Sequence, residues 1–160
     1  MKYGAYDREA AVNYARRWAF SRNPAYANFD EMGGDCSNFV SQCLLAGTRI
    51  MNHTPVSGWY YYSLNDRSAS WTGVEYLYRF LTNNRGAGPF AARISRQALR
   101  PGDVIQLGRN DGSFYHTLMV SSVSSGIRVA SHSLDAFDRP LSDYYYDQAR
   151  FLGVEGARSG

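Results

Sequence analysis

The sequence predicts an α+β fold in which N-terminal helices pack on an antiparallel sheet. Three observations predict it. In the first half of the chain, apolar residues recur at intervals of three and four, the spacing of one helix face. After Pro101 they occur instead in short runs that are separated by turn sequences, as in a meander of strands. The length of 160 residues suits a single domain.

Three helices are expected in the first half. Asp7 is placed to cap a helix over residues 7–21, and a second helix should start at Asp35 or Cys36 and end at Gly47. Thr72-Gly73-Val74-Glu75 has the pattern of a capping box and should open a third helix over residues 74–81. The connection over residues 48–71 is longer than a compact domain needs, which indicates a functional loop or a further element.

Four strands are expected in the second half, at residues 104–107, 114–123, 127–132 and 151–154. Short turn sequences, Arg109 to Gly112 and Ser124 to Gly126, separate the first three. We expect the domain to cover residues 3–155 and residues 156–160 to be a disordered tail.

Composition excludes several classes of protein. The 17 basic and 14 acidic side chains give a net charge of +3, too small and too scattered to indicate a nucleic-acid partner. No run of apolar residues is long enough for a membrane span, and two cysteines are too few for a disulfide scaffold. Met1 to Tyr6 has no apolar signal-peptide core. Both ends look like cut points in a longer protein.

The two cysteines lie on the same predicted helix, about 10 Å apart along its axis at 1.5 Å per residue. They are therefore too distant to form a disulfide within one subunit. Cys36 lies where the unpaired N–H groups and dipole of the helix start favour a thiolate. It also falls on the apolar stripe, so a buried structural role is the competing interpretation. Cys43 lies two turns further on and is expected in the core.

Two histidines lie on neighbouring predicted strands. His116 interrupts an apolar run and His132 ends the next strand, so a short turn can bring them side by side. With Cys36 they would supply a nucleophile, a base and an orienting residue. The competing interpretations are two ordinary histidines, or three ligands of a zinc ion, for which the spacing is a weak signal. His53 lies in the irregular connection and is expected at the surface.

Four segments resemble NlpC/P60-type and related papain-like cysteine peptidases. They are Gly33 to Gln42 (GGDCSNFVSQ), Leu99 to Ile105 (LRPGDVI), Tyr115 to Val120 (YHTLMV) and Ala130 to His132 (ASH). Over roughly residues 3–155 the chain is similar, more specifically, to the amidase 6 family of amidase domains. Its supporting segments include Tyr6 to Ala11, Arg22-Asn23-Pro24, Ser41-Gln42-Cys43, Gly58 to Tyr61, Ser70-Trp71 and Gly88-Pro89.

The resemblance implies a papain-like, NlpC/P60-type single domain that cleaves an amide bond, in bacterial cell-wall peptides, without a cofactor or metal. It implies a peptide or peptidoglycan-derived substrate and a secreted or cell-surface setting in a longer bacterial protein. Cys36 would be the nucleophile and His116 the general base and acid. His132, or alternatively Asp135, would orient His116. A thiolate–imidazolium pair of Cys36 and His116 would lower the pKa of the thiol.

The oxyanion of the tetrahedral intermediate needs hydrogen-bond donors, and the Cys36 backbone N–H is the first candidate. Tyr26 is the candidate for a second, side-chain donor, with Asn23 as the alternative. Aromatic residues provide rigid contact area with polar tips, so three of them are candidates for one wall of a substrate groove. These are Trp59, Tyr60 and Tyr61, whereas Trp71 is expected in the core.

Two functions from other classes remain open. A thioester-forming acyltransferase would use the same triad but exclude water from the acyl-enzyme. A non-catalytic cell-wall binding module would use the aromatic residues and leave Cys36 idle. Selective labelling of Cys36 by a thiol reagent, without labelling of Cys43, would argue against the binding module.

Overall fold

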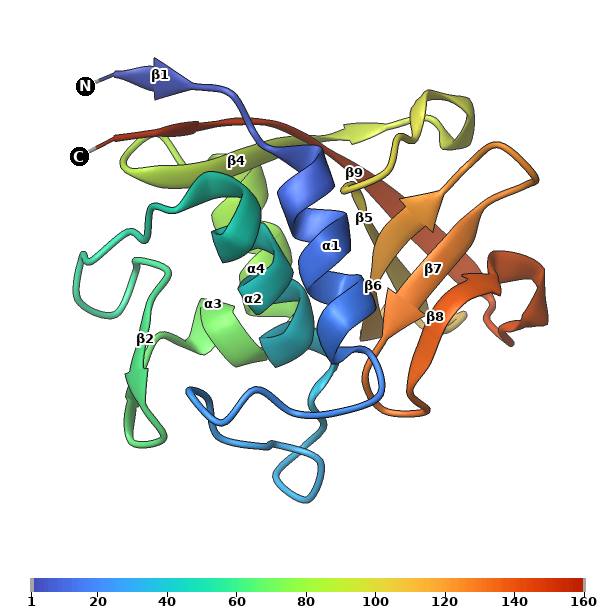
Figure 1. Cartoon of the computed structure of the whole chain (residues 1–160), viewed down its shortest axis with the longest axis horizontal. Coiled ribbons are helices and arrows are strands. Elements are labelled where there is room, and N and C mark those ends of the chain that lie inside the picture. The colour runs from blue at the N-terminus through green and yellow to red at the C-terminus, as the bar shows by residue number, and fades with distance from the viewer. Residues whose placement is uncertain (1, 160) are drawn as a thin grey trace.

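The computed structural model describes residues 2–159, in which a layer of helices covers one face of an antiparallel sheet (Figure 1). The helices are α1 (Arg8–Trp18), α2 (Cys36–Thr48), the short α3 (Ala69–Thr72) and α4 (Val74–Asn83). Helix α2 packs on α1 and against strand β6, and α4 packs against β4 and β6. The predicted α+β class is confirmed. No helix among the described residues has the length and apolar character needed to cross a membrane.

The seven strands of the large sheet run in the order β1-β9-β5-β6-β7-β8, with β4 also paired to β9, and every pair is antiparallel. Strand β9 therefore lies inside the sheet, between β4 and β5. Their bounds are β1 (Tyr3–Gly4), β4 (Gly88–Ile94), β5 (Val104–Gly108), β6 (Phe114–Ser122), β7 (Arg128–Ser131), β8 (Ala136–Pro140) and β9 (Gln148–Arg158).

Both faces of this sheet are covered. Between the sheet and the helices lies the larger core, where Phe39 and Leu44 of α2 meet Met119 of β6 and Leu152 of β9. A second cluster lies on the opposite face, under two short 3₁₀ helices, Arg96–Ala98 and Leu141–Asp143. Strand β5 is buried on both faces, and its apolar residues are interrupted by one buried polar side chain, Gln106.

The helices start and end close to the predicted positions. The Asp7 side chain accepts a hydrogen bond from the Ala10 N–H at 3.0 Å, which confirms the predicted cap of α1. The capping box predicted at Thr72 is wrong, because Gly73 is the N-cap of α4 and no side chain bonds to the free N–H groups. Thr72 belongs instead to the preceding short helix, α3.

The long connection contains elements that the sequence patterns did not predict. A small hairpin of β2 (Tyr61–Ser63) and β3 (Asp66–Arg67), followed by α3, occupies its second half. Strands β4 and β8 were also not predicted. These segments are short or rich in Gly, Pro and Arg, so they lack the two-residue alternation that marks a half-buried strand.

The predicted disordered tail is wrong over residues 156–158, which continue β9 and pair with β1 and β4. Ala157 is buried, with 2% of its surface exposed. Ser159 donates its N–H to the Lys2 carbonyl at 2.8 Å, and Gly160 lies outside the described residues. The end of the domain is therefore part of the sheet.

Deletion of residues 156–160 should lower the free energy of unfolding by roughly 2–3 kcal/mol, the combined effect of lost ladder hydrogen bonds and the buried Ala157 methyl group. Urea unfolding followed by circular dichroism measures it. An unchanged unfolding midpoint would show that this end of β9 contributes nothing to stability.

Candidate active site

Cys36 is the first residue of α2, and 7% of its surface is exposed. Gly33 and Gly34 precede it with φ values of 99° and 108°, which a side chain would strain, and they turn the chain into the helix. Asp35 is the N-cap residue of α2, but its side chain makes no capping hydrogen bond to the first turn. Cys36 therefore lies where the backbone N–H groups of the helix start are free.

Burial raises the pKa of the Cys36 thiol, although hydrogen bonds from the backbone and side chains of Thr117 and Ser37 act in the opposite direction. The sequence predicted the reverse, a lowered pKa from a thiolate–imidazolium pair. No hydrogen bond joins the sulfur to His116 in the described part of the chain. Because burial outweighs the donors, the thiol of the unliganded protein is in its neutral form at pH 7.

His116 lies on β6, directly before Thr117, and its half-buried ring has no hydrogen-bond partner among the groups described. Desolvation lowers the pKa of His116 to about 4. The nearest aromatic partner is Tyr144, whose ring centre lies 6.1 Å away. The imidazole is therefore neutral over the physiological range and free to accept a proton.

Cys36 and His116 line the same cavity, which has a volume of about 770 Å³. Its floor and walls come from the glycine turn before α2, from β5 and β6, and from residues 133–145. Ser133 and Leu134 on its rim have φ values of 65° and 67°, the strained left-handed region for such residues. The cavity is also lined by Asp30, Leu107, Tyr115, Arg139, Asp143 and Tyr145.

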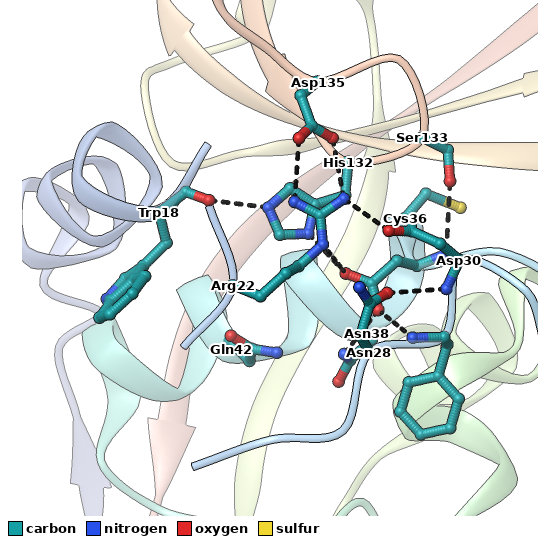
Figure 2. A network of polar contacts seen from close by, with 12 residues as sticks. Trp18, Arg22, Asn28, Asp30, Cys36, Asn38, Gln42, His132, Ser133 and Asp135 are labelled. Carbon is teal, nitrogen blue, oxygen red and sulfur yellow. Dashed lines mark hydrogen bonds and ion pairs between the residues drawn. The ribbon is translucent and has the colours of Figure 1, made fainter. Parts of the chain in front are cut away.

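A buried polar network lies behind Cys36 (Figure 2). The Asp35 carboxylate has no exposed surface and accepts hydrogen bonds from the Phe29 N–H at 2.8 Å and from Asn38 Nδ2 at 2.9 Å. Its other oxygen lies 2.5 Å from His132 Nδ1 and 3.5 Å from Arg22 Nε. Burial alone would raise the pKa of Asp35, but the bonds from His132, Asn38 and Phe29 hold it below its usual value.

His132 does not orient His116. Its Nδ1 faces Asp35, and its Nε2 lies 2.7 Å from the Trp18 carbonyl oxygen (Figure 2). A carbonyl oxygen can only accept, so Nε2 donates to Trp18 while Nδ1 contacts the Asp35 carboxylate. The ring also stacks on Phe39 at 4.0 Å. Both ring nitrogens are thus occupied, and the structure gives His132 a place in the network behind Cys36.

The alternative orienting residue, Asp135, is also directed elsewhere. Its carboxylate pairs with the Arg22 guanidinium through two contacts of 2.9 and 3.0 Å (Figure 2). Arg22 bonds Asp30 as well at 2.9 Å, so one guanidinium joins three carboxylates around the site. The sequence patterns did not predict this role for Arg22, because a lone arginine in a loop carries no spacing signal.

The proposed oxyanion side chains do not line the cavity. Tyr26 packs against Trp71 and Tyr61, with ring centres 5.9 and 5.0 Å away. Asn23 donates to the Tyr14 hydroxyl at 3.1 Å and accepts from the Ala25 N–H. The Cys36 N–H is the candidate that remains.

The predicted aromatic wall of the substrate groove is wrong for this cavity. Its three residues are buried in and around the main core and do not line the cavity of Cys36. Trp71 is fully buried, as predicted. Tyrosines do line the cavity, but they come from β6 and from the segment after β8. The three buried residues that were predicted to form the wall are Trp59, Tyr60 and Tyr61.

The zinc alternative finds no support in the geometry. Both ring nitrogens of His132 are bonded to protein groups, so His132 cannot join Cys36 and His116 as a ligand. Among residues 2–159 no three His, Cys, Asp or Glu side chains are grouped to hold a metal ion.

Residues 5–154 match the family described as "Putative amidase domain", the family that the sequence motifs resemble. The chain belongs to this family. Membership indicates a hydrolase that acts on C–N bonds.

A curated relative, the uncharacterized protein YhbB of Bacillus subtilis (strain 168), is 42% identical over 125 residues. The match covers 76% of this chain but 39% of that protein, so the chain spans less than half of the relative's length. No solved structure matches the chain, and the papain-like assignment stays a prediction.

Replacement of His132 by Ala should lower the free energy of unfolding by about 3–5 kcal/mol, because it removes one partner of a buried pair and leaves the Asp35 carboxylate without its contact to His132 Nδ1. The matched control is Asp135→Asn, which changes a partly exposed pair and should cost about 1 kcal/mol or less. Urea unfolding measures both. A His132→Ala protein of wild-type stability that has lost all activity would restore the orienting role.

The same network predicts the direction of a pH effect. The folded-state pKa of Asp35 lies below its unfolded value, so its contribution to stability is complete above the unfolded pKa of about 3.9. That contribution is lost as the pH falls through the folded pKa. Acid unfolding curves of wild type and Asp35→Asn should therefore converge at low pH. Curves that run parallel down to pH 2 would contradict the assignment.

Proposed function

We propose that this domain is a cysteine-dependent amide hydrolase of the NlpC/P60-like, papain-like type. The observation that carries the proposal is the shared cavity, where the start of α2 presents Cys36 and strand β6 presents His116. A thiol at a helix start and an unpartnered imidazole in the same cavity supply a nucleophile and a base. Membership in the amidase family supports hydrolysis of a C–N bond.

The resting protein holds both groups in their neutral forms, so the mechanism begins with a general-base step. His116 turns toward the thiol, accepts its proton, and the sulfur attacks the amide carbonyl carbon. The tetrahedral intermediate collapses to a thioester as His116 passes the proton to the leaving amine. A water molecule, deprotonated by His116, then attacks the thioester and releases the carboxylic acid and the free thiol.

The negative oxygen of each tetrahedral intermediate needs donors that are in place beforehand. The Cys36 backbone N–H lies in the first turn of α2, where N–H groups have no helical partner. The positive end of the helix dipole acts in the same direction.

The substrate class we propose is the peptide part of the bacterial cell wall, which the resemblance to NlpC/P60-type peptidases implies. The cavity suits a polar peptide, because tyrosines 115 and 144 offer contact area while Arg139 and Asp143 offer both signs of charge. A cell-wall substrate requires a secreted or cell-surface location. Digestion of purified muropeptides followed by mass spectrometry tests the activity and identifies the bond that is cleaved.

Cys36→Ala should abolish hydrolysis of the substrate found in that digest while leaving the unfolding midpoint near that of wild type. Cys43→Ser is the matched control, since Cys43 is fully buried on the same helix and away from the cavity. It should cost about 1–3 kcal/mol of stability, the effect of burying a hydroxyl, and keep its activity when folded. Cys36→Ser that retains more than a few per cent of wild-type turnover would refute the nucleophile.

The pH dependence follows from the neutral pair. Because His116 must be unprotonated to act as a base, kcat/KM should fall on the acid side near its pKa of about 4. His116→Ala should lower kcat/KM by roughly 10²–10⁴-fold. It should hardly change the rate at which iodoacetamide alkylates Cys36 in the unliganded protein, which should rise only at alkaline pH.

An alkylation experiment can also contradict the neutral pair. Fast alkylation at pH 5–6 in wild type that disappears in His116→Ala would demonstrate a thiolate–imidazolium pair, as the sequence alone predicted. The neutral resting pair would then be wrong, although both residues would remain in the mechanism.

A further inference from the structure

Ser37 and Thr117 each follow a proposed catalytic residue in sequence, and their hydroxyls meet in the interior. The two oxygens lie 2.9 Å apart, and neither side chain is exposed. The contact joins the first turn of α2 to β6 directly beside Cys36 and His116. The Ser37 hydroxyl also lies 4.0 Å from the Cys36 sulfur.

The Gln106 side chain on β5 approaches Thr117 from the other side, and its orientation is fixed. Arg150 on β9 directs two N–H groups at Gln106 Oε1, at 2.9 and 2.7 Å, and a guanidinium can only donate. The amide nitrogen therefore faces the opposite way, where it donates to the Val74 carbonyl at 2.9 Å and to the Thr117 hydroxyl at 3.2 Å.

Arg150, the first donor of this series of hydrogen bonds, is almost completely buried, since only 5% of its surface is exposed. Its guanidinium lies 3.5 Å from the Tyr78 ring centre and 3.9 Å from that of Phe114. Its remaining partner is the half-exposed carboxylate of Glu75 at 2.8 Å. A buried cation held between two rings has a fixed position, so the orientation of Gln106 is fixed as well.

A count of the hydroxyl hydrogens in this hydrogen-bonded series leaves one O–H that can donate to the Cys36 sulfur. Thr117 receives a hydrogen bond from Gln106, and one hydrogen lies between the Thr117 and Ser37 oxygens. The two hydroxyls carry two hydrogens, so whichever of them donates to the other, one O–H remains. The acceptor described beside that remaining O–H is the sulfur of Cys36.

We propose that Arg150, Gln106, Thr117 and Ser37 form a hydrogen-bond relay that holds an O–H donor against the Cys36 sulfur and stabilises the thiolate as it forms. These are positioning residues, since none of them lines the cavity. Hydrogen bonds to a charged acceptor are about twice as strong as neutral ones, so the relay acts when the thiol loses its proton. Its role in turnover rests on the proposed function, but the thiolate can be measured without turnover.

The test is the pH dependence of Cys36 alkylation by iodoacetamide, followed by peptide mass spectrometry. By the same count, a single substitution leaves one hydroxyl whose O–H can still face the sulfur, so both hydroxyls must be removed. The double variant Ser37→Ala/Thr117→Val has neither O–H and should raise the apparent pKa of the Cys36 thiol by about one unit. Thr117→Ser keeps both hydroxyls and should retain the wild-type profile. Ser41→Ala is the matched control, because Ser41 is a buried serine of the same helix that bonds Trp71 and Trp59 instead.

The other titratable and charged groups near the sulfur are the same in every variant, so they do not account for a difference in pKa between the variants. These groups are Asp30, Asp35, His116, Arg139 and Asp143. Superimposable profiles for wild type and the Ser37→Ala/Thr117→Val double variant would overturn the relay, and so would an equal shift in Ser41→Ala. If this double variant does not fold, Ser37→Ala/Thr117→Ala decides alone. A shifted profile in a protein that hydrolyses no amide would keep the relay and refute the proposed function.

Discussion

The Asp35 carboxylate has no contact with solvent, so neighbouring donors must replace its hydration completely, and these donors come from three separate segments. Phe29 and Arg22 belong to the loop after α1, Asn38 belongs to α2, and His132 follows β7. An unpaired buried carboxylate would cost several kcal/mol, a large part of the stability of a domain of this size. The start of α2 is thereby held in one place relative to the sheet, and the position of Cys36 follows from it.

Two opposing effects act on the sulfur that this arrangement positions. The helix start and its dipole favour a thiolate by about 0.3–2 kcal/mol, and the nearby donors add to this. Burial opposes both and is the larger effect, because the pKa of Cys36 is raised overall. The raised pKa therefore favours the neutral thiol over the thiolate in the unliganded protein. In the mechanism that we propose, the balance changes when a substrate binds in the cavity and His116 accepts the proton of the thiol.

Local signals in the sequence were sufficient for the parts of this account that depend on a single element. The capped start of α1, the position of Cys36 at the start of α2 and the three middle strands follow from spacing and turn residues alone. The role of His132 could not be predicted in that way, because it depends on strand register. Met119 lies opposite Ala130 in the β6–β7 pair, and β7 ends at Ser131, so His132 lies in the turn that follows the paired residues. A shift of one residue moves a side chain to the other face of a sheet.

The aromatic residues show the same limit. The ring centres of Trp59 and Trp71 lie 4.7 Å apart, within a core to which all four described helices and the sheet contribute. Nothing in the local pattern separates such residues from the wall of a groove, since both settings favour large rings with polar tips. The burial of Arg150 also could not be predicted from the sequence, because its partners lie on α4, β5 and β6.

Covalent trapping of the acyl-enzyme tests the central claim most directly. The protein would be mixed with the peptide identified by muropeptide digestion, quenched in acid within seconds, and analysed by intact-mass and peptide mass spectrometry. The account predicts a mass increase equal to the acyl portion of the substrate, located on Cys36 and absent from Cys36→Ala. Hydrolysis at the wild-type rate by the Cys36→Ala protein, with no adduct on the wild type, would contradict it.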